Sequence, residues 1–570
     1  MTVLPTSQTR NLATAPAAWT LSVSRPLMTL LTALWLLLFS NLPFWRDVWQ
    51  GVDGLDNGNW LFLLSLPLFA WLWLYLLLSL LAWGRMTKAV LGAMLLVSAA
   101  ASYFMGRYGI VIDSSMLTNV LQTDGAEAAE LLSWRLLVWL ALVGGLPLLA
   151  LSRLRSRPRG WRRELGIKLG SMVLALVCLL GIALSQYQSY ASLLRNHHEL
   201  RLLLTPSNVL AALHGYLRRE LQAPPRLQVI GADAHRLASV GAARKPRLTV
   251  LLVGETARAA NFSLNGYARE TSPELAKAGV ISFSHVSSCG TATAVSVPCM
   301  FLEVGRDQYQ ESMSRNREGL LDVLQRAGVR VLWRDNNSGC KGACDRVPSE
   351  DVSHLELADL CADGECHDEV LLSGLQGYLD KLDDDAVVVL HMKGSHGPAY
   401  YKRYPAAFEK FVPVCRSNEL DQCSSQSIVN AYDNSLAYTD HVLAQTVALL
   451  ERNAARLDTA MLYVSDHGES LGEGGLYLHG LPYAMAPDEQ THVPMILWVS
   501  EGLLRQEGLQ AHCLTGLKDQ RLSHDNLFHS VLGLMAVQTS TYRPERDLFR
   551  QCLAPQQAAA QMDSAASRVN

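Results

Sequence analysis

Residues 460–469 run Ala-Met-Leu-Tyr-Val-Ser-Asp-His-Gly-Glu, an apolar segment that leads directly into polar side chains. The apolar part, Ala460–Val464, predicts a buried strand. Neighbouring residues on a regular strand face opposite ways, so Asp466 and His467 can bind one ion only where the chain turns. Gly468 permits such a turn. An isolated Asp-His pair is usually a surface pair or a helix cap, but its position after an apolar strand favours a metal site.

Four similar apolar runs occur in the C-terminal half of the chain. They alternate with helical segments, including a long helix predicted at 430–452 with apolar residues along one side. Strands that alternate with helices are typical of an α/β domain with a mostly parallel sheet. Besides Ala460–Val464, the predicted strands are Arg247–Val253, Val329–Trp333, Ala386–His391 and Pro494–Val499.

Polar side chains follow several of these strands. In such sheets ligands bind beyond the carboxyl ends of the strands. Glu255 follows the first predicted strand, just as Asp466 and His467 follow a later one. The three form a mixed oxygen and nitrogen set that suits Zn²⁺ and leaves a fourth position for a nucleophile or substrate. The other polar residues at these ends are Asp335, Asn336, Asn337, His391, Lys393 and His396.

Two threonines lie between two cysteines in residues 288–301, Ser-Cys-Gly-Thr-Ala-Thr-Ala-Val-Ser-Val-Pro-Cys-Met-Phe. A helix that begins near Ala294, with Pro298 in its first turn, would place Thr293 at a helix N-terminus, where backbone N–H groups favour a phosphate. Taken alone, the segment fits a disulfide-closed loop with incidental threonines equally well. A zinc ion beside Thr293 would lower the pKa of its hydroxyl and let it attack a phosphorus atom.

The N-terminal third of the chain predicts a membrane domain. A chain of 570 residues needs at least two domains, and its net charge of −3 gives no reason to expect a nucleic-acid partner. Apolar residues concentrate before residue 190. Five runs there fit membrane spans: Pro26–Phe44, Trp60–Trp83, Ala89–Met105, Leu136–Leu151 and Leu169–Tyr187.

The basic residues of the connections between these spans predict the orientation. Basic residues precede span one and lie between spans two and three, and six arginines lie between spans four and five. The other two connections are acidic. Basic connections stay in the cytoplasm. An odd number of spans then places the N-terminus in the cytoplasm and everything after Tyr187 outside it.

An amphipathic region separates the membrane domain from the soluble domain. Leucines recur at helical spacing through 188–221, with a break at Thr205-Pro206, and Ala223-Pro224-Pro225 follows as a linker. These helices would lie either in the membrane interface or against the soluble domain. The expected organisation is a five-helix transmembrane domain at 1–187, amphipathic linker helices at 188–225 and an α/β domain at 226–570.

Four short motifs together give a specific resemblance that covers nearly the whole chain. They are Val253-Gly-Glu-Thr-Ala-Arg258, Cys289-Gly-Thr-Ala-Thr293, Gly394-Ser-His-Gly-Pro398 and Ser465-Asp-His-Gly-Glu469. The chain resembles the lipid A phosphoethanolamine transferases, the polymyxin- and colistin-resistance enzymes of the alkaline phosphatase superfamily. The resemblance implies five spans followed by a sulfatase-like periplasmic domain.

The resemblance also implies roles for individual residues. It assigns Glu255, Thr293, Asp466 and His467 to a tightly bound zinc ion, with Thr293 as nucleophile. A second zinc ion at the substrate phosphate is left open. The residues expected to contact substrate are Asn119, Thr123, Glu127, Asn337, Lys341, His391, His396 and His479. The first three form a trio expected to bind ethanolamine, and their spacing of four residues would place them on one helix face. A capping or solvent-facing role is the alternative for the trio.

Ten of the eleven cysteines lie outside the predicted spans, on the side where oxidation is expected. Sequence order suggests four pairs, Cys289–Cys299, Cys340–Cys344, Cys361–Cys366 and Cys415–Cys423, and leaves Cys513 and Cys552 as a candidate fifth. A cysteine-rich zinc site is less favoured because paired Cys-x-x-Cys motifs are absent from the sequence. Cys178 lies within a span and is expected to be a buried apolar residue.

The function expected from these features is transfer of phosphoethanolamine from phosphatidylethanolamine to a lipid A phosphate through a phospho-threonine. Such transfer would reduce the negative charge of the envelope and give polymyxin resistance. We expect a monomer in the inner membrane of a Gram-negative cell, with its catalytic domain in the periplasm and in contact with membrane lipids. The alternatives are another acceptor, such as core sugars or an envelope glycan, a hydrolase, and a sensor with a degenerate site. The sulfatase signature Cys-x-Pro-x-Arg is absent at the nucleophile position.

Overall fold

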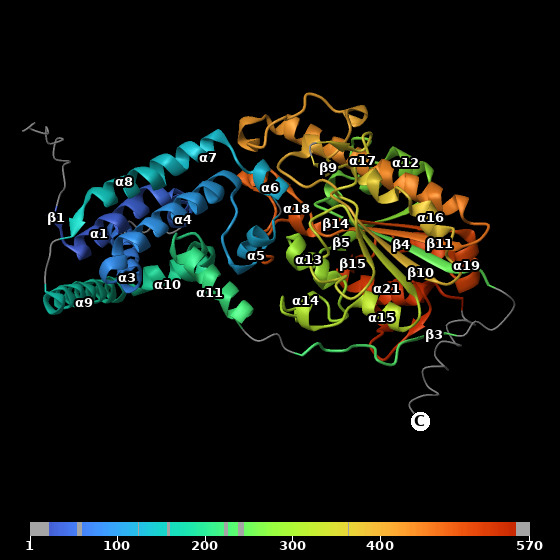
Figure 1. Cartoon of the computed structure of the whole chain (residues 1–570), viewed down its shortest axis with the longest axis horizontal. Helices are drawn as coiled ribbons and strands as arrows, with labels where there is room; N and C mark the ends of the chain where they lie inside the picture. Colours follow the sequence, from blue (N-terminus) through green and yellow to red (C-terminus); the bar gives the residue numbers. More distant parts are fainter. Residues whose placement is uncertain are drawn as a thin grey trace, which may run out of the picture. The chain divides into compact units, whose positions relative to one another are not determined.

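The computed structural model describes residues 22–53, 60–123, 125–156, 160–221, 226–237, 244–362 and 364–554. Contacts divide the chain into two compact units. The helical unit comprises the residues up to Tyr103 together with Arg135–Val209. The α/β unit comprises Phe104–Trp134 and the residues from Leu210 onward (Figure 1). The domain boundaries expected at residues 187 and 225 remain a prediction.

The helical unit contains the membrane segments. Four helical segments are long and apolar enough to cross a membrane: Trp60–Leu81, Gly84–Tyr108, Trp134–Arg153 and Trp161–Ser185. A fifth candidate is a pair, Arg25–Ser40 and Leu42–Trp49, bent by 64° at Asn41. The bend falls within the first predicted span. Within the described residues, the protein therefore has four candidate membrane spans, or five if the bent pair crosses as one.

The helices of this unit share a small apolar core. Helix α1 (Arg25–Trp35) packs against α3 (Trp60–Leu81) and α9 (Trp161–Ser185) around Leu36, Leu74, Leu78 and Leu91. Much of the remaining apolar surface points outward, as a bilayer requires. Cys178 also lies on the exposed surface of α9, so the expectation that it is buried in the protein is wrong.

The α/β unit is built on an eight-stranded sheet with the order β15-β5-β14-β11-β4-β10-β6-β7. The five strands predicted from apolar runs are all present: β4 (Arg247–Gly254), β6 (Arg330–Asp335), β10 (Ala386–His391), β11 (Asp458–Ser465) and β14 (His492–Val499). Four of them run parallel, whereas β14 is antiparallel to β11. The others are β5 (Ile281–Ser287), β7 (Ser349–Asp351) and β15 (Arg521–Ser523). The fold class is confirmed, with a mixed rather than purely parallel sheet.

Pro494 explains an irregularity in β14. Proline cannot donate to a strand ladder and is tolerated in sheets at edges and bulges. The register between β14 and β5 shifts between Val493 and Met495, on either side of this proline.

Two apolar cores lie on opposite faces of the sheet, because side chains alternate along each strand. Strand β4 illustrates this alternation: Leu251 and Val253 join one core, whereas Leu248, Val250 and Leu252 join the other. Helices α13 (Thr293–Met300), α15 (Leu320–Arg326) and α21 (Leu527–Leu534) cover the first face. The long predicted helix, observed as α17 (Ser425–Arg452), covers the second (Figure 1).

The segment expected to be amphipathic forms three short helices. They are α10 (Tyr187–Asn196), a 3-10 turn at His198–Leu202 and α11 (Ser207–Leu221), with the expected break at Thr205-Pro206. Five disulfide bonds are present in the described residues. They join Cys289 to Cys299, Cys340 to Cys344, Cys361 to Cys366, Cys415 to Cys423 and Cys513 to Cys552.

Candidate metal and nucleophile site

Glu255, Asp466 and His467 meet at the carboxyl edge of the sheet. Strands β4 and β11 are adjacent and parallel, and Gly254 pairs with Ser465, so the residues that follow them emerge side by side. One ligand atom from each of the three side chains lies within 4.8 Å of the other two. All three side chains are buried. This arrangement can hold a metal ion, and the three residues are called the metal-binding group below.

Gly468 allows the sharp turn that brings Asp466 and His467 to the same point. Its N–H donates to the carbonyl of Gln490, and a Cβ atom at this position would lie 2.0 Å from the carbonyl oxygen of Glu489. Only glycine fits so close an approach.

Thr293 is the first residue of α13, and its hydroxyl points into the same site. Thr293 Oγ1 lies 3.0 Å from Glu255 Oε2 and 3.3 Å from His467 Nε2. Thr291, two residues earlier, instead donates to the carbonyl of Leu481 at 2.6 Å. Thr293 therefore lies at a helix N-terminus, as expected, but Pro298 lies inside α13 rather than in its first turn.

The side chains of the site fit a metal ion in detail. His467 Nδ1 lies 2.9 Å from the carbonyl oxygen of Gly468, which fixes the ring with Nε2 directed at Glu255 and Asp466. Such a hydrogen bond from the outer nitrogen is usual for a metal-binding histidine. Asp466 Oδ2 is buried and accepts no hydrogen bond from any residue that the structure describes. A cation would satisfy that oxygen.

The electrostatics of the three side chains also favour a cation. Burial opposes the charge on Glu255, but a hydrogen bond from His467 and the charges of nearby histidines hold its pKa well below its usual value. Burial and the charge of Glu255 raise the pKa of Asp466 to about 7. Burial lowers the pKa of His467, but the two carboxyl groups outweigh it and raise that pKa to about 10. A proton on His467 thus balances the negative charge of the two carboxylates. A bound metal ion would balance that charge instead and would take the place of the proton.

Two further histidines lie beside the metal-binding group. The ring of His479 is centred 4.3 Å from that of His467 and 5.5 Å from that of His396. His479 Nδ1 lies 2.8 Å from Glu469 Oε2, and Tyr400 donates to the other oxygen of Glu469 at 2.6 Å. The structure therefore brings together His396 and His479, as the resemblance implied, and adds Glu469 as the residue that orients His479.

Asn337 and His391 also lie next to the site. Asn337 Nδ2 donates to Glu255 Oε2 at 2.9 Å and lies 3.5 Å from His391 Nε2. His391 Nδ1 lies 2.9 Å from Asp335 Oδ2. Lys341 donates to the carbonyl and hydroxyl oxygens of Ser338 at 2.9 Å, within its own loop. Asn337 thus contacts Glu255 directly and links it to His391, whereas Lys341 donates to Ser338 in its own loop.

The three residues expected to bind ethanolamine, Asn119, Thr123 and Glu127, do not share one helix face. Helix α5 (Ser114–Gln122) contains Asn119 and ends before Thr123, whose ψ of 130° is extended. Glu127 lies in a separate helix, α6 (Gly125–Glu130), and its side chain lies outside the described residues. The prediction of a shared face is wrong because Thr123 leaves the helix. Helix α5 nevertheless packs against α13, which carries Thr293.

Two residues that the sequence did not reveal tie this segment to the site. Glu130, at the end of α6, pairs with Arg403 at 2.6 Å, and both side chains are 3% exposed. Arg403 also donates to the carbonyl oxygen of His396 at 2.8 Å and to Glu365 at 3.1 Å. Arg403 therefore connects α6 to the loop that carries His396.

His524 is a third residue that sequence reasoning missed. Its Nδ1 accepts a hydrogen bond from the N–H of Cys289 at 3.0 Å, and its Nε2 lies 2.9 Å from the carbonyl oxygen of Ser465. Burial lowers its pKa to about 4, so it is neutral and serves as a hydrogen-bonding bridge. It joins the disulfide-closed segment that carries Thr293 to the end of β11.

Comparison with known proteins places the chain in a family. Residues 247–537 match the sulfatase family, and residues 70–221 match the family of phosphoethanolamine transferases EptA/EptB. Phosphoethanolamine transferase EptA of Escherichia coli (strain K12) is 43% identical over 525 residues, which cover 92% of this chain and 96% of that protein. Phosphatidylethanolamine transferase Mcr-1 of Escherichia coli is 40% identical over 529 residues, 90% of this chain and 96% of that protein.

A solved structure agrees with these sequence relatives. The integral membrane lipooligosaccharide phosphoethanolamine transferase A (EptA) from Neisseria meningitidis superimposes with a TM-score of 0.90 at 39% identity. The match covers 94% of this chain and 100% of that one, so it includes both the helical unit and the α/β unit. The chain therefore belongs to the phosphoethanolamine transferase family and is a membrane-embedded enzyme of that family.

Proposed function

We propose that the protein transfers phosphoethanolamine from phosphatidylethanolamine to a phosphate of lipid A, through a covalent phospho-threonine at Thr293. The observation that carries the proposal is the position of Thr293 Oγ1, at a helix N-terminus and 3.0 Å from Glu255 in a buried metal-binding group. The names of its relatives support the choice of substrates. One is a phosphatidylethanolamine transferase, and another acts on lipooligosaccharide.

The first half of the reaction forms a bond between Thr293 Oγ1 and the phosphorus of the donor. The bond between that phosphorus and the diacylglycerol oxygen breaks, the threonine proton is lost, and diacylglycerol leaves after taking up a proton. In the second half, an oxygen of a lipid A phosphate attacks the same phosphorus and restores the threonine hydroxyl. The backbone N–H groups at the start of α13, where Thr293 lies, would donate to the phosphoryl oxygens and stabilise their charge.

Glu255, Thr293, Asp466 and His467 are the proposed ligands of a tightly bound zinc ion. Zinc, when bound, would supply positive charge that lowers the pKa of the threonine hydroxyl and stabilises the transferring group. Glu255 is held in position by Thr256, which donates to Glu255 Oε1 at 2.6 Å. His467 is held by the carbonyl oxygen of Gly468.

The remaining residues are proposed to bind the two substrates. His396 and His479, next to His467, would donate to phosphate oxygens or hold a second zinc ion. Asn337, which donates to Glu255 and lies next to His391, would also contact substrate together with His391, and Lys341 would contact the lipid headgroup. Asn119, Thr123 and Glu127 would bind the ethanolammonium group from the segment that packs on α13.

The proposed location is the inner membrane of a Gram-negative cell, with the α/β unit in the periplasm. The arginine-rich connection Arg153–Arg163 supports this orientation, because basic connections remain in the cytoplasm. Capping lipid A phosphates with phosphoethanolamine, whose ammonium group is positive, would reduce the net negative charge that attracts cationic polymyxins. Polymyxin resistance is the proposed consequence.

Mass spectrometry of lipid A from cells with and without the protein tests this function. The expected result is phosphoethanolamine on lipid A phosphates only in cells that make the protein. Thr293→Ala should abolish the addition, whereas Thr291→Ala should retain it because the Thr291 hydroxyl donates to Leu481 and not to the site. Addition to core sugars in place of lipid A would support the alternative acceptor. Activity retained by Thr293→Ala and lost by Thr291→Ala would refute the nucleophile assignment.

A further inference from the structure

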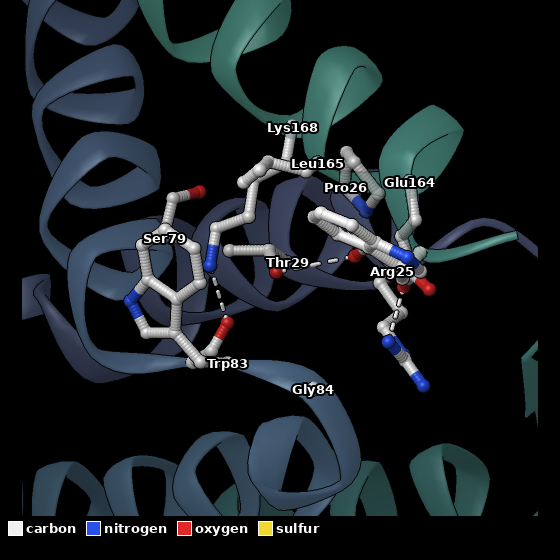
Figure 2. Close-up of a pocket in the computed structure, with 11 residues that line it drawn as sticks. Arg25, Pro26, Thr29, Ser79, Trp83, Gly84, Glu164, Leu165 and Lys168 are labelled. Carbon is white, nitrogen blue, oxygen red and sulfur yellow. Dashed lines mark hydrogen bonds and ion pairs between the residues drawn. The ribbon is translucent and has the colours of Figure 1, made fainter.

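A pocket of about 230 Å³ lies within the helical unit, where the ends of three helices meet. Its walls come from the start of α1, the end of α3 and the start of α9 (Figure 2). Pockets for drug-sized ligands usually measure about 300–1,000 Å³. This one is smaller and suits a single headgroup rather than a whole lipid.

The charged side chains of the pocket favour an anion. Lys168 Nζ donates to the carbonyl oxygen of Ala82 at 2.6 Å and lies 3.6 Å from the centre of the Trp83 ring (Figure 2). An ammonium group has three donors, so Lys168 can also donate to a phosphate oxygen. Arg25 pairs with Glu164, which is the one acidic residue among the described residues that line the pocket. Two cations thus face one carboxylate.

Further basic residues surround the pocket on the same helix ends. Arg85 lies in the 3-10 turn Gly84–Met86 just after α3, and Arg162 and Arg163 lie in the first turn of α9, all three exposed. Each lysine or arginine near the membrane surface contributes about 1 kcal/mol to the binding of anionic lipid. A zwitterionic headgroup has no net charge and gains little from this surplus.

Exposed apolar residues next to the pocket indicate that the anion belongs to a lipid. Trp83 and Trp161, at the rim, are 46% and 70% exposed, and tryptophans in such positions lie at the level of lipid headgroups. An exposed stripe on α9 continues from Leu165 at helical spacing and could lie along an acyl chain: Leu169, Val173, Leu176 and Leu180. Free phosphate would bind the cationic side chains but would make no contact with this apolar stripe.

We propose that this pocket binds the phosphate headgroup of an anionic phospholipid. The bound lipid is not a substrate, and its acyl chain lies along α9. The proposal goes beyond the transfer reaction and does not depend on it. Basic pockets between membrane helices are a recurrent type of anionic-lipid site.

Native mass spectrometry of the full-length protein in detergent tests the proposal. Titration with phosphatidylglycerol and with phosphatidylethanolamine should show tighter binding of the first. Lys168→Met should weaken phosphatidylglycerol binding about fivefold, as expected for the loss of one basic residue, and Lys168→Arg should restore it. Lys88→Met is the matched control, because Lys88 also donates to a helix-end carbonyl, that of Ser152, but does not line the pocket.

A second variant covers the case in which Lys168→Met fails to fold. Trp161→Ala changes a largely exposed ring at the rim and should also weaken phosphatidylglycerol binding. Equal affinity for the two lipids would overturn the proposal. So would equal effects of Lys88→Met and Lys168→Met, since they would indicate non-specific attraction. Displacement of phosphatidylglycerol by inorganic phosphate would indicate a free-anion site instead.

Discussion

At the scale of single residues, the chemistry of the site rests on which polar atoms lie within reach of one another. Thr293 and Thr291 are two positions apart, yet one hydroxyl faces Glu255 and the other donates to Leu481. The two oxygens of the Asp466 carboxylate differ in the same way. Oδ1 accepts hydrogen bonds from the N–H groups of Thr256 and His467, whereas Oδ2 accepts no hydrogen bond from the described residues. The two oxygens of one carboxylate therefore differ in role: one is structural and the other is available to a cation.

The first prediction concerns the metal ligands. Glu255→Ala, Asp466→Ala and His467→Ala should each lose bound zinc and transfer activity, because each removes one donor from a small set. His396→Ala and His479→Ala should retain the tightly bound zinc while turnover falls by roughly 100–1,000-fold, the range for loss of a group that stabilises charge. Metal analysis and turnover of purified variants measure both effects. Full zinc occupancy in all three ligand variants would remove them from the metal site.

At the scale of elements, the buried pair of Glu130 and Arg403 fixes helix α6 to the loop that carries His396. Removing one member of a buried ion pair leaves an uncompensated charge and costs about 3–5 kcal/mol. Arg403→Met should therefore lower thermal stability strongly and reduce turnover by displacing His396. Lys402→Met is the control, since Lys402 also pairs with Glu130 but its side chain is 42% exposed, and it should cost less than about 1 kcal/mol. Thermal unfolding in detergent distinguishes the two, and equal losses would contradict the role of Arg403.

The same network predicts a dependence of stability on pH. Burial opposes the charge of Glu365, but Arg403 and Lys393 outweigh it and lower its pKa to about 2. The pKa of a glutamate in an unfolded chain is about 4.3. The ion pairs of Glu365 therefore stabilise the folded state fully above that pH, and this contribution is lost as the pH falls toward about 2. Urea unfolding across this range should show a steeper loss for the wild type than for Glu365→Gln. Parallel curves would mean that Glu365 contributes nothing to acid sensitivity.

Sequence patterns predicted the elements of the site but not the contacts between distant ones. Glu255, Asp466 and His467 could be found because each follows an apolar run that becomes a strand. Glu130 and Arg403 could not, because they are 273 residues apart and neither belongs to a periodic pattern. His524 gave no local signal for the same reason.

Helix boundaries were the other source of error. The spacing of Asn119, Thr123 and Glu127 predicted one continuous helix, but the backbone at Thr123 is extended. The spacing of residues predicts a shared face only while the helix continues, and the sequence did not indicate where α5 ends.

At the scale of the whole molecule, both proposed substrates are bilayer lipids, so the helical unit should raise their effective concentration at the site. A fragment that begins near residue 226 keeps every proposed zinc ligand and should bind zinc and cleave a water-soluble phosphoethanolamine analogue. It loses Phe104–Trp134, including Glu130, and should modify lipid A in cells poorly. Lipid A profiles of cells that export the fragment, compared with cells that make the full chain, measure the difference. Equal modification would show that the membrane segments are not needed for the reaction.

The proposed covalent intermediate is tested most directly by mapping where phosphoethanolamine attaches to the protein. Purified full-length protein would be incubated with phosphatidylethanolamine in the absence of acceptor, digested and analysed by tandem mass spectrometry. The adduct is expected on Thr293, should disappear when lipid A is added, and should be absent from Thr293→Ala. Attachment to another residue, or transfer by the wild type through no detectable adduct, would contradict Thr293 as the nucleophile.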